Sequence, residues 1–343
     1  MKYITFAVPC YNSQDYLSKC VASLITGGDD VEIIIVDDGS TDNTAAIADG
    51  WAERYPSAVK VIHKPNGGHG SGIMAGLGAA TGLYYKVVDS DDWLDGEAYA
   101  SLLSVIKDNC SRGEEVDLYI TNFVYEHVND GTRYISGYAK NFPQNRVFGW
   151  DEIKPLKLWK MLLMHSLVYN TQKLRQCGIS LPEHTFYEDN LFAYAPLAHM
   201  QELYYLNVDM YRYYIGRSDQ TVTIDNLVSH YTDQITVMRR MLAAYSGEQL
   251  SSMCRPQRRQ MYHTLHAVMC NTYFFTTAKD SPQRRRDFAE MFAELKSRDV
   301  ALYRRIRRMP LLFMVDRLPW KLKGKVTTAS YKFLCRHVKL GQL

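Results

Sequence analysis

Val87-Val88-Asp89-Ser90-Asp91-Asp92-Trp93 is the stretch that decides the fold class. β-Branched residues typical of a buried strand run directly into three carboxylates. Carboxylate oxygens suit Mg²⁺ or Mn²⁺, and such ions keep open positions that the phosphates of a nucleotide can fill. The alternative is an acidic turn in which Asp92 or Asp95 caps a helix beginning near Gly96. The motif by itself is compatible with both a cation site and a turn.

The pattern around this motif predicts a doubly wound α/β fold with a mostly parallel sheet. Strand-like apolar runs alternate with helix-like spacing, which is the signature of βαβ units. We expect strands over residues 3–8, 31–36, 59–63, 83–88 and 116–121 and helices over 14–26, 42–55, 71–80 and 96–109, with Asn12 and Ser40 or Thr41 as N-caps. From about 122 to 225 the pattern becomes mixed and tyrosine-rich, and long amphipathic helices follow.

Three polar loops follow strands of the predicted sheet. They are residues 9–12, Asp37-Asp38-Gly39-Ser40 and residues 89–92. In such sheets ligands bind outside the carboxyl ends of the strands, so we expect the three loops to converge. The two aspartates of the second loop favour hydrogen bonding to a base or ribose over a simple helix-capping turn.

Other polar segments leave alternatives open. Residues 66–72, Asn-Gly-Gly-His-Gly-Ser-Gly, either offer backbone N–H groups to a diphosphate or form a flexible turn, and His69 is interpreted as a polar loop residue. Glu188 and Asp189 precede a helical pattern, where a carboxylate either favours the helix dipole or acts as a general base. Arg212 and Arg217 either clamp phosphate oxygens or stack on tyrosines.

Composition indicates a folded protein with a distinct basic end. The 343 residues are 46% hydrophobic and 22% charged, which is typical of globular proteins. Seven scattered cysteines without CxxC spacing argue against a disulfide framework or a zinc site. The start shows no secretory leader, so a cytoplasmic location is expected. Residues 281–343 carry 16 Lys and Arg against 5 Asp and Glu, a net +11 against −8 for the remainder.

The last part of the chain, residues 301–343, has the composition of a membrane-surface segment. It holds 11 Lys and Arg and one acid, Asp316, interleaved with aromatic and aliphatic residues. Its apolar run, residues 309–315, is far shorter than the roughly 20 residues of a spanning helix, so the tail should lie on an anionic membrane surface. The alternatives are docking on the acidic body of the protein or mediating an oligomer. Nucleic acid is not an expected partner.

Taken together, Pro9-x-Tyr11-Asn12, Val36-Asp37-Asp38-Gly39-Ser40, Gly76-Leu77-x-x-Ala80-x-Gly82, Asp89-Ser90-Asp91-Asp92 and Glu188-Asp189 resemble family 2 glycosyltransferases of the bacterial surface-polysaccharide type. The resemblance covers about residues 1–225 and implies a GT-A domain there, with a nucleotide-sugar-binding half (1–121) and an acceptor half (122–225). A helical extension (226–300) and the basic tail (301–343) would follow. It also implies a nucleotide-sugar donor, Mn²⁺ or Mg²⁺, and inversion at the anomeric carbon.

The resemblance assigns roles to individual residues. Pro9, Tyr11 and Asp38 should border the nucleobase and ribose, and Asp38 as a partner of uracil implies a UDP-sugar. Asp91 should bind the metal, and Asp89 the ribose or the metal. Asp189 should be the catalytic base and Glu188 its orienting neighbour, the two acidic corners meeting across one crevice.

Two departures from the family pattern bear on these roles. The Ala-Arg-Asn segment of many relatives is replaced by Gly72-Ile73-Met74, so Lys64, the glycine loop or Arg217 should compensate for the missing arginine. The Gln-x-x-Arg-Trp signature of processive synthases is absent, which favours transfer of one sugar per encounter.

We therefore expect an inverting, metal-dependent hexosyltransferase that moves one sugar from a UDP-sugar to a hydroxyl of a glycan or lipid-linked glycan acceptor. It would be attached peripherally to the inner face of the plasma membrane. The alternatives are a noncatalytic sugar-nucleotide-binding or scaffold protein, or a sugar nucleotidyltransferase, which normally has a Gly-rich loop with Arg and Lys after the first strand.

Overall fold

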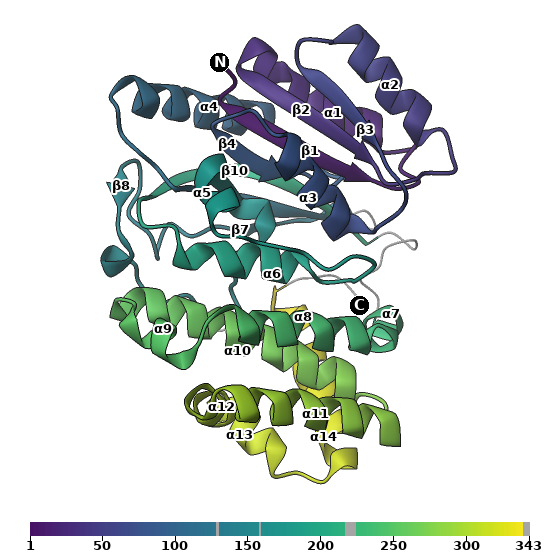
Figure 1. Ribbon diagram of the computed structural model, residues 1–343, viewed down its shortest axis with the longest axis vertical. Coiled ribbons are helices and arrows are strands. Elements are labelled where there is room, and N and C mark those ends of the chain that lie inside the picture. Colours follow the sequence, from purple (N-terminus) through teal and green to yellow (C-terminus); the bar gives the residue numbers. More distant parts are fainter. Residues whose placement is uncertain (128–129, 158, 217–223, 339–343) are drawn as a thin grey trace. The chain divides into compact units, whose positions relative to one another are not determined.

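The computed structural model describes residues 1–127, 130–157, 159–216 and 224–338. The chain forms two compact units (Figure 1). Unit 1 comprises Met1–Lys154, Leu162–Thr185 and Pro196–Tyr214, and unit 2 comprises Pro155–Met161, Phe186–Ala195 and Ile215–Leu343. Domain boundaries at residues 225 and 300 remain predictions.

A mixed sheet organises unit 1. Its strands β1 (Ile4–Cys10), β2 (Val31–Asp37), β3 (Val59–His63) and β4 (Tyr84–Val87) run parallel in the order β3-β2-β1-β4. The order continues β9-β6-β10-β5, and β9 is antiparallel to both β4 and β6. The bounds are β5 (Trp93–Leu94), β6 (Leu118–His127), β9 (Leu167–Asn170) and β10 (Leu203–Ile215), with β7 (Arg133–Ser136) pairing β6 and β8 (Val147–Phe148) pairing β10. The α/β fold class predicted from the sequence is confirmed.

Helices α1 (Leu17–Leu24), α2 (Thr44–Arg54), α3 (His69–Ala79), α4 (Gly96–Ser111) and α5 (Thr171–Gln176) accompany the sheet. Short 3₁₀ segments lie at η1 (Ile25–Asp30), η2 (Trp150–Glu152), η3 (Met164–Ser166) and η4 (Ala195–Ala198). Strand β1 is buried along its whole length because helices cover both of its faces: Phe6 packs edge-on against Tyr99 of α4, and Ala7 faces α3. This explains why the side chains of β1 are mostly apolar on both faces rather than alternating between apolar and polar.

Glycines bring α3 unusually close to β1. A Cβ at Gly72 would lie 2.8 Å from Cβ of Pro9, and one at Gly76 would lie 2.6 Å from Cβ of Ala7. Only a glycine fits where two backbones approach so closely. Gly72 is the first residue of the segment that replaces the family's Ala-Arg-Asn pattern. Because it has no side chain, α3 can pack closely against β1.

The predicted helix starts are wrong in two places. Helix α1 begins only at Leu17, α2 begins at Thr44, and neither has a side-chain cap. Asn12 instead adopts a left-handed backbone with φ 49° and accepts a hydrogen bond from the Thr41 N–H at 2.8 Å. Its side chain therefore joins two loops rather than capping a helix. Of the two candidate caps for α4, Asp95 accepts from the Ala98 N–H at 3.1 Å.

Unit 2 is helical. Its helices are α6 (Asp189–Tyr194), α7 (Ile224–Ser229), α8 (Tyr231–Ala244), α9 (Gly247–Ser252), α10 (Arg255–Thr277), α11 (Pro282–Arg298), α12 (Val300–Arg307), α13 (Pro310–Asp316) and α14 (Trp320–Val338). The amphipathic spacing expected after residue 225 is present in α8, where Val237, Met238, Met241 and Leu242 are buried, whereas Tyr245, expected on the same helix, follows its last residue in an extended conformation.

The basic C-terminal helices pack on α10. Tyr273 donates a hydrogen bond to Asp316 at 2.7 Å, and the ring of Tyr331 stacks on Phe274 with centroids 4.2 Å apart. Asp316 also forms an ion pair with Arg307 at 2.6 Å. The one acidic residue of the tail is therefore neutralised by a residue of unit 2. Among the described helices, none combines the length and the apolar character needed to cross a bilayer.

Candidate active site at the carboxyl edge of the sheet

The three polar loops converge, as predicted. Cys10 at the end of β1 pairs with Asp37 at the end of β2, and β4 lies on the other side of β1. Hydrogen bonds join the loops directly: Ser13 and Ser90 share one between their hydroxyls at 2.7 Å, and the Asn12 N–H donates to the Ser40 hydroxyl at 3.0 Å. Parallel strands with a common direction place their following loops at one edge.

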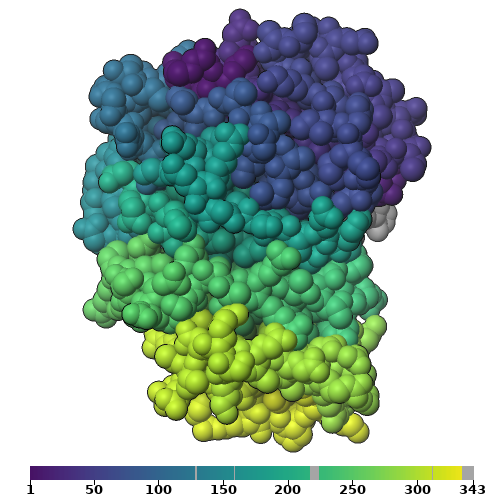
Figure 2. Space-filling model, viewed as in Figure 1, coloured from purple at the N-terminus to yellow at the C-terminus, as the bar shows by residue number. Residues whose placement is uncertain are grey.

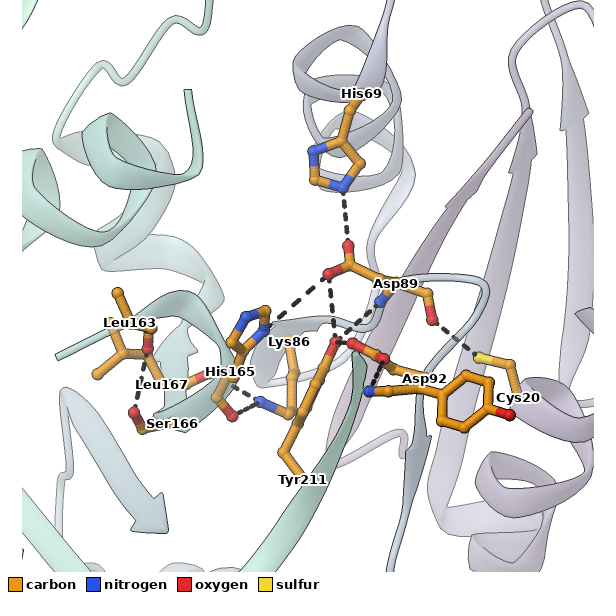
Figure 3. Close-up of polar contacts among 11 residues, drawn as sticks. Cys20, His69, Lys86, Asp89, Asp92, Leu163, His165, Ser166, Leu167 and Tyr211 are labelled. Carbon is orange, nitrogen blue, oxygen red and sulfur yellow. Dashed lines mark hydrogen bonds and ion pairs between the residues drawn. The ribbon is translucent and has the colours of Figure 1, made fainter. Parts of the chain in front are cut away.

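Asp89 and Asp92 form an acidic cluster with a histidine from a distant segment (Figure 3). One donor atom each of Asp89, Asp92 and His165 lies within 4.8 Å of the others. His165 belongs to η3, which precedes β9, and β9 is the antiparallel neighbour of β4. The strand order therefore delivers His165 to the end of β4.

Hydrogen bonds orient both carboxylates. His69, the first residue of α3, contacts Asp89 Oδ1 through Nε2 at 2.9 Å. Tyr211 of β10 donates to Asp92 Oδ2 at 2.7 Å and accepts from the Asp89 N–H at 3.1 Å. The Tyr214 N–H donates to Asp92 Oδ1 at 2.8 Å. The acidic loop is thus tied to both α3 and β10.

A buried lysine supports the histidine. Lys86 in β4 is 1% exposed and donates to the backbone carbonyl of His165 at 2.7 Å. Burial lowers the pKa of Lys86 to about 7 and that of His165 to about 4, because desolvation disfavours the charged form of each. His165 is accordingly a neutral imidazole at neutral pH, the form in which histidine binds metals.

The carboxylates respond to each other's charge. Burial and then the neighbouring charges of Asp91 and Asp89 raise the pKa of Asp92 well above its usual range. Burial opposes ionisation of Asp89 as well, but the hydrogen bond and charge of His69 outweigh it and lower the pKa of Asp89. A divalent cation would relieve this concentration of negative charge, so the residues present fit one. The assignment of the metal to Asp91 and Asp89 remains a prediction.

Asp38 is occupied by the glycine loop. Its carboxylate accepts from the backbone N–H groups of Gly67 and Gly68, at 2.9 and 2.7 Å, and from Lys64 Nζ at 2.5 Å. These two glycine N–H groups thus bind a carboxylate of the protein in this structure. Pro9 is buried beneath α3, whereas Tyr11 is 52% exposed.

The guanidinium of Arg212 forms ion pairs with carboxylates of the protein. It bridges Glu126 at 3.0 Å and Asp95 at 2.8 Å, so its charge is already paired. Arg217 lies outside the described residues. Cys10 is buried, and desolvation together with Asp37 raises its pKa to about 12, which leaves it inert as a nucleophile. Six cysteines are free in the described part of the chain: Cys10, Cys20, Cys110, Cys177, Cys254 and Cys270.

Glu188 and Asp189 belong to unit 2. Glu188 is buried, and Asp189 opens α6, where its carboxylate accepts from Asn190 Nδ2 at 3.0 Å. Tyr187 before them has a left-handed backbone, φ 70°, and packs against Phe275 with centroids 5.3 Å apart. Such strain in a residue other than glycine is held in place by packing and is frequent beside functional groups. The predicted meeting of Asp189 with Asp91 across one crevice stays a prediction.

Comparison with known proteins relates the first part of the chain to a protein family. Residues 5–152 match the model of glycosyl transferase family 2. The resemblance to family 2 glycosyltransferases expected from the sequence motifs is thus confirmed over this segment. EpsH of Bacillus subtilis, named as a glycosyltransferase, is 29% identical over 235 residues, which cover 63% of this chain and 61% of EpsH. Glycosyltransferase GlyA of Streptococcus pneumoniae is 25% identical over 250 residues, 69% of this chain and 35% of GlyA. The matched segment thus spans less than two thirds of either relative.

The fold of the chain is similar to that of a solved structure. The crystal structure of S. aureus TarS 1–349 in complex with UDP-GlcNAc has a TM-score of 0.64 at 19% identity, covering 100% of this chain and 93% of that chain. This likeness supports the GT-A fold together with the C-terminal helical region.

Sequence reasoning missed three residues of the candidate site: Lys86, His165 and Tyr211. A signal for Lys86 existed, because a lysine inside the apolar run of β4 needs a buried partner. His165 and Tyr211 carry no local signal. Only the pairing of β9 and β10 with the rest of the sheet brings them to Asp89 and Asp92.

Proposed function

We propose that this protein is an inverting, metal-dependent glycosyltransferase that moves one sugar from a UDP-sugar to a hydroxyl of a glycan or lipid-linked glycan acceptor in cell-surface polysaccharide synthesis. The observation that carries the proposal is the cluster of Asp89 and Asp92 at the carboxyl edge of a family 2 fold. The TarS structure, which contains UDP-GlcNAc, supports the choice of a UDP-sugar.

Donor binding is assigned to the converging loops. Pro9, Tyr11 and Asp38 would border the uridine, and exposed Tyr11 has a ring free to stack on a base. Lys64 and Arg217 would supply positive charge toward the diphosphate. Because Asp38 holds Lys64 and the glycine loop, it would position these groups even where it does not touch the base.

The chemistry requires a base and a stabilised leaving group. Asp189 would take the proton of the acceptor hydroxyl while that oxygen attacks the anomeric carbon from the face opposite the diphosphate, and Glu188 would orient Asp189. Asp91 and Asp89 would hold a divalent cation, which when bound supplies positive charge to the departing UDP. The bond to the diphosphate breaks as the new glycosidic bond forms, which inverts the anomeric centre.

A panel of nucleotide sugars with Mn²⁺ or Mg²⁺ tests this function. For the unchanged protein, we expect both donor hydrolysis and a thermal shift with at least one UDP-sugar. The Asp189→Asn variant should keep the thermal shift but show no donor hydrolysis. No response to any UDP-sugar would overturn the nucleotide assignment.

We further propose attachment to the anionic cytoplasmic leaflet through the tail. The exposed face of α14 carries Leu322, Val326 and Phe333 among lysines, and Phe313 and Met314 of α13 are also exposed. Part of the surface of the C-terminal helices is drawn in yellow in Figure 2. Since Asp316 is paired internally, the outward charges of the tail are basic, which suits anionic headgroups at about 1 kcal/mol per residue near the surface.

Liposome flotation tests the attachment. Changing Leu322, Val326 and Phe333 to Ser should abolish flotation with phosphatidylglycerol vesicles, whereas Ile135→Ser, at a residue 53% exposed in unit 1, should not. Equal flotation of the two variants would refute attachment through this face.

A further inference from the structure

We infer that His165, together with Asp92, is a direct ligand of the divalent cation that the proposed function places at Asp89 and Asp91, and that the nitrogen of His165 makes the site select a first-row transition ion such as Mn²⁺ over Mg²⁺. This inference deepens the proposed function, because it concerns the cation of the same site. The roles drawn from the family resemblance assign no histidine to it.

The first observation is an unpartnered nitrogen aimed at the acidic cluster. His165 has a side chain only 5% exposed, and its Nδ1 has no hydrogen-bond partner within the described parts of the chain. The nearest carboxylate oxygen, Oδ2 of Asp89, is 4.0 Å away, which is too far for a hydrogen bond. Buried polar atoms are almost always paired, so an orphan beside two carboxylates points to a missing partner.

The second observation is the spacing of the three donors. All lie within 4.8 Å of one another. Two ligands on opposite sides of one ion are about 4.2 Å apart, twice a metal–oxygen distance of about 2.1 Å. Among three donors at most one pair can be opposite and adjacent donors are about 3.0 Å apart, so side-chain movements of about 1 Å would bring all three into one coordination shell.

The third observation is that outer contacts hold each donor in place. Lys86 Nζ donates to the His165 backbone carbonyl (Figure 3). The His165 ring packs against Tyr211 and Tyr213, with centroids 4.6 and 4.5 Å apart. His69 and Tyr211 hold the carboxylates. Ligands of protein metals are typically oriented by such outer hydrogen bonds, whose loss costs about 10–100-fold in affinity.

Donor chemistry gives the selectivity. Mg²⁺ demands oxygen ligands in near-ideal octahedral geometry, whereas imidazole nitrogen suits first-row transition ions. A buried neutral imidazole contributes nothing to Mg²⁺ that a water would not supply better. Carboxylates joined by one imidazole should therefore bind Mn²⁺ more tightly than Mg²⁺, with His165 as the residue that decides the difference.

Electron spin-echo modulation of the Mn²⁺-loaded protein, without any nucleotide, tests the inference. We expect modulation from a directly bound ¹⁴N nucleus, changed to the ¹⁵N pattern when histidine is ¹⁵N-labelled. His165→Phe, which keeps a packed ring but no donor, should lose the modulation and at least about tenfold in Mn²⁺ affinity, with little change in Mg²⁺ affinity. His69→Asn is the matched control and should retain the modulation.

The inference would be overturned if the protein bound no Mn²⁺ or bound it without nitrogen modulation. It would also be overturned if the modulation survived in His165→Phe, whether or not His69→Asn lost it. If His165→Phe fails to fold, the isotope substitution in the unchanged protein still decides whether a histidine is bound. A negative donor panel with intact nitrogen modulation would refute the UDP-sugar assignment while leaving this inference standing.

Discussion

Removing the hydroxyl of Tyr211 should loosen the acidic loop from the sheet. That hydroxyl donates to Asp92 Oδ2 at 2.7 Å and accepts from the Asp89 N–H at 3.1 Å. Tyr211 and Asp92 are 0% and 1% exposed, so water cannot take over either contact without rearrangement. Tyr211→Phe therefore leaves one buried carboxylate oxygen and one backbone N–H short of a partner.

The expected cost follows from these two contacts. A hydrogen bond to a charged group contributes about 1.5–3 kcal/mol, and an unsatisfied buried N–H costs about 1–3 kcal/mol. Contacts that share one atom are not additive, so we expect a total of about 2–4 kcal/mol. Since about 1.4 kcal/mol corresponds to a factor of ten, the hydrogen-exchange protection factors of the acidic loop should fall by roughly 30- to 1,000-fold.

Tyr213→Phe is the matched control. The Tyr213 ring packs on His165 as the Tyr211 ring does, at 4.5 Å, but within the described residues its hydroxyl makes no hydrogen bond with the acidic loop. We expect Tyr213→Phe to change the free energy of local opening of the acidic loop by no more than about 0.5 kcal/mol. Native-state hydrogen exchange of a peptide spanning residues 87–95 measures both variants. Equal loss of protection in the two would show that ring packing, not the hydroxyl, holds the loop.

Three further predictions concern pH, packing and chemistry. Burial lowers the pKa of His165 from about 6.5 in the unfolded chain to about 4, so the contribution of neutral His165 to folding stability is present above about pH 6.5 and is lost as the pH falls toward 4. In urea unfolding of the metal-free protein, the free energy of unfolding should therefore fall by about 2 kcal/mol from pH 7 to pH 5, and His165→Phe should remove this dependence on pH. Gly76→Ala should be about 1–3 kcal/mol less stable than Gly78→Ala in thermal unfolding, because the first Cβ would lie 2.6 Å from Ala7 Cβ and the second meets nothing within 4 Å; equal stabilities would contradict the packing account. Asp189→Asn should abolish sugar transfer while calorimetry still detects donor binding, and retained turnover would remove Asp189 from the role of base.

The strand pattern could be read from the sequence because it is local. Residues 59–63 were expected as a strand and form β3, and the expected strand over 31–36 becomes β2, Val31–Asp37. Parallel topology then fixed the convergence of the loops after β1, β2 and β4. Helix starts were harder to predict, since Asn12 and Thr41 satisfy each other across two loops instead of capping helices.

The histidine and the tyrosine of the candidate site could not be predicted in the same way. His165 precedes a strand that pairs antiparallel with β4, and Tyr211 lies in β10, which reaches the acidic loop through the strand order. Nothing in the residues beside them distinguishes them from the other histidines and tyrosines of the chain.

The sequence by itself determined the fold class, the edge of the sheet where the polar loops gather and the basic character of the tail, because these depend on periodicity, chain direction and composition. The tertiary structure decided which side chains meet Asp89 and Asp92, which glycine N–H groups Asp38 binds, and which face of α14 is left outward. Those contacts join residues far apart in the chain, so they exist only once antiparallel pairing and helix packing have been established.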